Sequence, residues 1–142
     1  MKKHLIFAVL FFSSGFLFSQ NSKSDDFYLK KLYEHININN DSILFYAEKL
    51  KHSRINCNAL RALNFEAKAH YQKENFDLAT NKSLDVLKKT KGKKADCYKL
   101  NKLTALNRLF WVYKNQNKYQ KAFKVALKRK EITESLDEKG DI

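Results

Sequence analysis

The stretch LNRLFWVYKNQNKYQKAF (Leu106–Phe123) decides the fold, because an earlier stretch of the chain repeats its pattern. LNFEAKAHYQKENFDLA (Leu63–Ala79) aligns without a gap over Leu106–Ala122. Both stretches begin Leu-Asn, and in both an aromatic residue is followed three positions later by Ala. A weaker third copy ends at NNDSILFYA, where Ile43 takes the position of Ala79. Such self-similarity is typical of repeat architectures.

The spacing of apolar residues predicts helices over almost the whole chain after Asp25. The expected stripes are Leu29/Leu32/Tyr33/Ile36, Ile43/Tyr46/Ala47/Leu50, Leu60/Leu63/Ala67 with His70 or Tyr71, Phe76/Ala79/Ser83/Leu87, Leu103/Leu106/Leu109/Phe110/Tyr113 and Tyr119/Ala122/Phe123/Ala126. Short polar links such as KENF and NQNKY join them, which implies antiparallel neighbours. A chain with 44% hydrophobic residues and no Pro is too apolar to be disordered and too poor in turn formers for a β-sandwich. We therefore expect an all-α fold of about six helices.

The last repeat resembles the tetratricopeptide repeat, whose pattern is W-x2-L-G-x2-Y followed by an Ala in the second helix. The matching positions are Leu106, Leu109, Phe110 and Tyr113, then Tyr119 and Ala122, and in the earlier unit Leu63, Ala67, Phe76 and Ala79. Leu106 replaces the usual Trp, Phe110 replaces the usual Gly, and no Pro closes a repeat. The resemblance implies a short right-handed α-solenoid of antiparallel helix pairs, with repeats at about 25–53, 56–91 and 95–137. Leu106, Leu109, Phe110, Tyr113 and Tyr119 would then belong to the core.

The N-terminus, MKKHLIFAVLFFSSGFLFSQ, has the layout of a secretory signal peptide. Lys2 and Lys3 precede an apolar run from Leu5 to Phe18, and small or polar residues follow it. We expect residues 1–19 to be removed after Ser19, residues 20–24 to be a linker, and residues 25–142 to form one exported, periplasmic repeat domain. An uncleaved signal anchor is the alternative, although a spanning helix wants about 20 apolar residues.

Export would place Cys57 and Cys97, 40 residues apart, in an oxidising compartment. Each lies near the start of an expected helix, so the two would meet as a disulfide if those helices are neighbours. The alternative is a pair of small buried side chains that do not touch. The sequence leaves both open, because bonding requires Cα atoms within about 7 Å.

In tetratricopeptide proteins the first helix of each repeat lines a concave surface, so the resemblance also implies a ligand groove. The residues expected to face it are Arg61, Asn64, Lys68, Tyr71 and Gln72 in one repeat and Thr104, Asn107, Trp111, Lys114 and Asn115 in the next. Such a surface suits an acidic or C-terminal peptide. Asn64, Asn107 and Arg108 resemble part of the carboxylate clamp of related proteins, but the full set is missing. The alternative is an ordinary solvated helix face with one partly buried Trp.

The formal net charge of +13 raises a second class of partner. LKKTKGKKADCYK (Leu87–Lys99) concentrates lysines in a manner that can bind nucleic acid or an anionic membrane, but a solvated turn at a helix end explains it as well. We expect no enzyme, cofactor or metal site. His35, His52 and His70 have no metal-ligand spacing, and neither a phosphate-binding Gly-rich loop nor a GxSxG turn is present.

The last expected helix carries the apolar residues Phe123, Leu127, Ile132 and Leu136, some of which should be exposed. We therefore expect further repeats, a second copy or a partner to cover this end. The first functional hypothesis is a non-catalytic scaffold that binds a protein or peptide. The alternatives are the truncated N-terminal sensor part of a membrane-spanning transcriptional regulator or kinase, which exported repeats of this type resemble, and a basic module that binds anions or nucleic acid.

Overall fold

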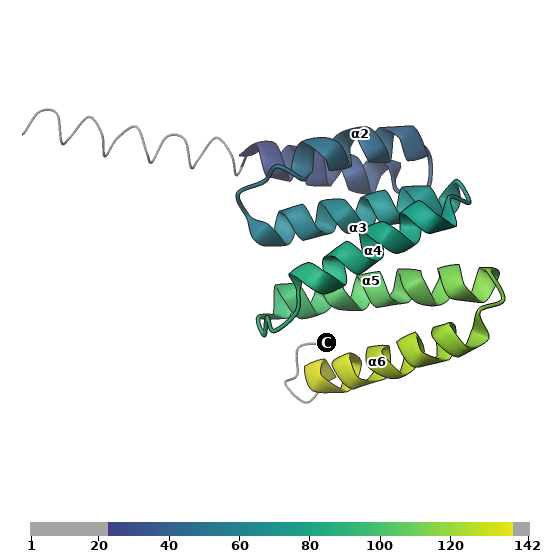
Figure 1. Cartoon of the computed structure of the whole chain (residues 1–142). Coiled ribbons are helices and arrows are strands. Elements are labelled where there is room, and N and C mark those ends of the chain that lie inside the picture. The colour runs from purple at the N-terminus through teal and green to yellow at the C-terminus, as the bar shows by residue number, and fades with distance from the viewer. Residues whose placement is uncertain (1–22, 138–142) are drawn as a thin grey trace, which may run out of the picture.

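The computed structural model describes residues 23–137, which form six helices and no strand. A first helix at residues 23–35 precedes the others, which are labelled in Figure 1. They are α2 (Asn40–Leu50), α3 (Asn56–Gln72), α4 (Phe76–Lys89), α5 (Asp96–Asn115) and α6 (Tyr119–Asp137). The prediction of an all-α fold is confirmed. The predicted signal peptide at residues 1–19 lies outside the described residues.

The turn inside each of the last two helix pairs has the same backbone geometry, which shows the repeat in three dimensions. Glu74 and Asn117 occupy equivalent positions of the two aligned stretches, and both are left-handed, with φ of 59° and 58°. In each turn, the backbone N–H of the residue after the left-handed one donates to the carbonyl oxygen five residues earlier in the chain. Asn75 N donates to His70 O, and Lys118 N donates to Tyr113 O, both at 2.8 Å. The sequence repeat is therefore also a structural repeat.

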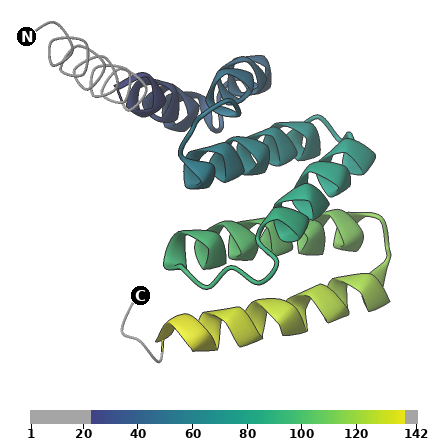
Figure 2. The same cartoon turned by 60° about the vertical axis from the view of Figure 1, so that its left-hand side comes forward.

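Each helix packs against the next along the chain, and α3 also packs against α5. That additional contact joins equivalent helices of successive pairs, as a solenoid-like stack requires. Figures 1 and 2 show the stack from two sides, with α6 at one end.

The core is a chain of small clusters along the stack rather than one centre. The first joins the first helix, α2 and α3 around Leu32, Ile43 and Phe65. The second lies between α3, α4 and α5, and the third joins Leu106 and Leu109 of α5 to Val125 of α6. This arrangement buries one face of each helix against each neighbour, because a single helix pair cannot bury its apolar surface alone.

The predicted core is confirmed at Leu106 and Leu109, which are both 1% exposed. Phe110 and Tyr113 pack partly buried against the same cluster. Tyr119 is the exception, since 64% of it is exposed. It is the first residue of α6, and its hydroxyl donates to Asn117 Oδ1 at 2.8 Å instead of entering the core.

Cys57 and Cys97 form a disulfide, with Cα atoms 6.1 Å apart. The bond links the first turn of α3 to the first turn of α5, the equivalent helices that the repeat places side by side. Within residues 23–137, none of the helices is both long and apolar enough to cross a membrane.

Candidate binding groove

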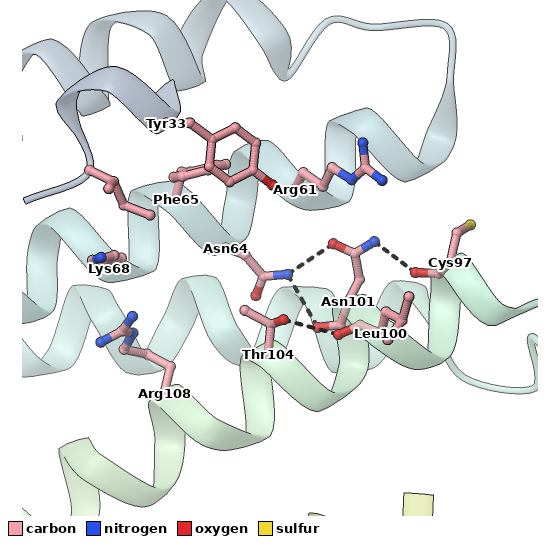
Figure 3. Close-up of a pocket in the computed structure, with 11 residues that line it drawn as sticks. Tyr33, Arg61, Asn64, Phe65, Lys68, Cys97, Leu100, Asn101, Thr104 and Arg108 are labelled. Atoms are coloured by element: carbon pink, nitrogen blue, oxygen red, sulfur yellow. Dashed lines mark hydrogen bonds between the residues drawn. The ribbon is translucent and has the colours of Figure 1, made fainter. Parts of the chain in front are cut away.

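A hollow of about 490 Å³ lies between the first helix with its following turn, α3 and α5 (Figure 3). We call it the α3–α5 groove. Its lining residues are Tyr33, Ile36, Arg61, Asn64, Phe65, Lys68, Cys97, Leu100, Asn101, Thr104 and Arg108. On α3 and α5 these residues recur at three- and four-residue steps, so each helix presents one continuous flank to the groove.

Three of the residues predicted on α3, namely Arg61, Asn64 and Lys68, line the α3–α5 groove. Tyr71 lies just beyond its edge, where its ring is 4.9 Å from the guanidinium carbon of Arg108 and its hydroxyl accepts a hydrogen bond from Asn115. The α3 half of the predicted surface is therefore gathered at one place.

Of the predicted α5 half, Thr104 lines the groove, whereas Asn107, Trp111 and Lys114 are exposed and do not line it. Trp111 packs edge-on against Phe110, and Lys114 Nζ lies 4.8 Å from its ring centre. The side of α3 that carries Asn64 contacts the side of α5 that carries Asn101. Asn107, the repeat equivalent of Asn64, therefore lies on the far flank of α5.

The groove residues missing from the predicted surface are mostly apolar. Tyr33 and Ile36 come from the N-terminal part of the chain, and Phe65 and Leu100 lie on α3 and α5. The Tyr33 and Phe65 rings meet edge to face with centres 5.2 Å apart, and half of Leu100 is exposed. Their sequence signal is the same apolar periodicity that marks a core, so periodicity alone does not distinguish a groove wall from a core residue.

A pair of buried amides joins the two helices at the floor of the groove (Figure 3). Asn64 Nδ2 donates to both the side-chain and the main-chain oxygen of Asn101, at 3.0 and 3.2 Å. Asn101 Nδ2 in turn donates to Cys97 O at 2.7 Å. Asn64 is only 8% exposed, yet its Oδ1 has no hydrogen-bond partner. A buried acceptor without a donor costs about 1–3 kcal/mol.

The groove carries three cationic side chains and no acidic one. Arg61 Nη1 donates to Asn58 Oδ1 at 3.4 Å and Lys68 Nζ donates to Asn37 Oδ1 at 2.9 Å, so both rest on neutral amide oxygens. Arg108 stacks on Tyr71, and its Nε is buried without a hydrogen-bond partner. Their charges are therefore not balanced by a carboxylate of the groove.

Burial acts on two of these cations. It lowers the pKa of Arg108. It also lowers the pKa of Lys68, and the nearby charge of Arg108 lowers that pKa further. A cation that is partly removed from water without an acidic partner is destabilised, and an anion bound beside it would relieve this. The arrangement suits a ligand with a negatively charged group and an apolar group next to it.

A second hollow of about 510 Å³, on another side of α3, is lined by Lys51, Lys82, Lys89 and Lys93 among others. Two of these lysines already have acidic partners. Lys51 Nζ lies 2.6 Å from Glu48, and Lys82 Nζ lies 2.5 Å from the buried Glu66. Asp85 also lines the hollow, so its charge is more nearly balanced than that of the α3–α5 groove.

Residues 23–137 contain no group of three or more His, Cys, Asp or Glu side chains placed to hold a metal ion. No protein-family model matches the chain, and neither a curated protein nor a solved structure shows significant similarity to it.

Proposed function

We propose that this protein is a non-catalytic scaffold that binds an extended protein or peptide segment with acidic character in the α3–α5 groove. The observation that carries the proposal is that three cations and an apolar wall line one groove that has no acidic side chain. The guanidinium groups of Arg61 and Arg108 and the ammonium group of Lys68 suit the carboxylates of such a segment.

The apolar wall supports a peptide over a small inorganic anion. Leu100, Phe65 and Tyr33 lie along the same groove as the cations, so an apolar side chain and an acidic one can be held together. Pockets that combine apolar surface with a few oriented polar groups are typical of specific ligand sites. An anion alone would use the cations and leave this wall in contact with water.

The proposal extends to the class of protein. The repeated turn and the contact between α3 and α5 support a relationship to tetratricopeptide-type scaffolds. The N-terminal sequence pattern supports export to the periplasm, and the disulfide between Cys57 and Cys97 suits an oxidising compartment.

The test is fluorescence anisotropy with labelled octapeptides that combine leucine and glutamate, next to matched peptides with glutamine in place of glutamate. We expect the glutamate peptides to bind more tightly, and Arg108→Met to weaken that binding about 10- to 100-fold, as loss of a charged hydrogen bond implies. Arg108→Met should leave the free energy of unfolding unchanged or raise it, because the variant removes a partly buried charge that has no acidic partner.

Arg54→Met is the matched control, because it removes the same charge from an exposed residue outside the groove. Equal loss of binding in both variants would assign the effect to net charge and contradict the groove. Equal binding of the glutamate and glutamine peptides would contradict the acidic ligand.

A further inference from the structure

α6 carries an exposed apolar stripe that neither the fold nor the α3–α5 groove uses. Tyr119, Phe123 and Leu127 are 64%, 65% and 48% exposed, and their four-residue spacing places them on one side of the helix. Among the described helices α6 packs against α5, with which it shares the cluster around Val125 on its opposite side. Figure 2 shows α6 at the end of the stack with its outer side open.

The charges around this stripe have one sign. From Lys118 to Lys130 the chain has six cations and no acidic residue, and the first acidic side chain of α6 is Glu131. The cations are Lys118, Lys121, Lys124, Lys128, Arg129 and Lys130. At about 100° per residue, Lys130 lies in line with the stripe and Lys124 lies on its flank. Two of the other cations turn toward α5 instead, since Lys121 lies over the Tyr113 ring and Arg129 over the Phe110 ring. The outer side of α6 is therefore apolar, with lysines on and beside the stripe and no acidic side chain between Lys118 and Lys130.

We propose that this outer face of α6 binds an anionic lipid surface. Phe123 and Leu127 would enter the boundary between headgroups and acyl chains, where exposed apolar side chains are stabilised. Tyr119 would stay at the headgroup level with its hydroxyl in water. The flanking lysines would keep their stems along the apolar stripe and direct their ammonium groups to the lipid phosphates.

The other occupants of such a face fit less well. A nucleic acid would bind the lysines but leave Phe123 and Leu127 in water. A second copy of the chain would bring two sets of six cations together, and like charges across an interface oppose association. The side of a single helix at the end of the stack is convex, and a deformable bilayer can cover it without a matching groove.

The test reads out the position of residue 123 at the bilayer. In the full chain, Trp111→Phe removes the single Trp, and Phe123→Trp then places a reporter on the stripe. Leu84→Trp in the same background is the matched control, because Leu84 is an exposed leucine on α4. Each protein is mixed with vesicles of equal parts phosphatidylglycerol and phosphatidylcholine that carry brominated acyl chains, or with brominated phosphatidylcholine alone.

We expect the Phe123→Trp reporter to be quenched and blue-shifted by the anionic vesicles only, and the Leu84→Trp reporter to be unchanged. Because both proteins retain the apolar run at residues 5–18, that run cannot explain a difference between them. Lys124→Gln, Lys128→Gln and Lys130→Gln together should weaken vesicle binding about a hundredfold. The same change at Lys88, Lys91 and Lys94, in and beside the α4–α5 turn, should weaken it much less.

If the protein sediments with the vesicles but the Phe123→Trp reporter is not quenched, the proposal is overturned. Equal quenching of both reporters would also overturn it. Absence of binding to either vesicle would also overturn it. A blue shift without vesicles, together with a dimer in analytical ultracentrifugation, would assign the stripe to a second copy instead.

Discussion

Replacing Cys57 and Cys97 together by serine should lower the free energy of unfolding by about 4 kcal/mol. The disulfide closes a loop with a sequence separation of 40 between the starts of α3 and α5. In the chain-entropy relation, a loop of this length restricts the unfolded chain by about 13 cal/mol/K, which is about 4 kcal/mol at 25 °C. A loss of this size is a large share of the 5–15 kcal/mol typical of a small domain, so the variant should be only marginally stable.

The measurement is urea unfolding followed by circular dichroism, with the oxidised protein and the double variant compared in the same buffer. Excess dithiothreitol should reduce the stability of the wild-type chain to that of the variant and leave the variant unchanged. If the variant unfolds within about 1 kcal/mol of the oxidised protein, the bond does not constrain the unfolded chain as the relation requires. Equal slopes with denaturant would show that both proteins expose the same surface on unfolding.

The remaining predictions concern the interior. Burial, with a contribution from Lys82, lowers the pKa of His70 below its ordinary value of 6.5, and its Nδ1 is buried without a partner. As the pH falls, the imidazole of His70 is therefore protonated at a higher pH in the unfolded chain than in the folded one. The free energy of unfolding should decrease as the pH drops below 6.5. Urea unfolding at pH 7.5 and pH 5 should show a smaller loss for His70→Gln than for the wild-type chain; an equal loss would assign the pH dependence to other groups. Leu109→Ala, at a site 1% exposed, should cost about 2–5 kcal/mol. Leu84→Ala, at a site 45% exposed, should cost less than about 1 kcal/mol, and similar losses would contradict the described core.

The six helices and their repeat were predictable because both are local. The spacing of apolar residues reports which side of a helix is buried, and the aligned stretches at Leu63 and Leu106 place their turns at equivalent residues. The common side of Arg61, Asn64 and Lys68 was predictable for the same reason, since three- and four-residue steps place them together on one helix.

Only the tertiary structure decided which side of α5 faces α3 across the groove. The repeat carries the α3 surface over to Asn107 and Trp111, but α5 presents Asn101 and Arg108 to the groove. Equivalent helices packed side by side meet through opposite flanks, and no local pattern contains that rotation. Likewise, the pairing of Asn64 with Asn101 and the approach of Cys57 to Cys97 depend on contacts across 37 and 40 residues. Periodicity determines that a helix has an apolar side, whereas the packing of its neighbours determines which parts of that side remain open to a ligand.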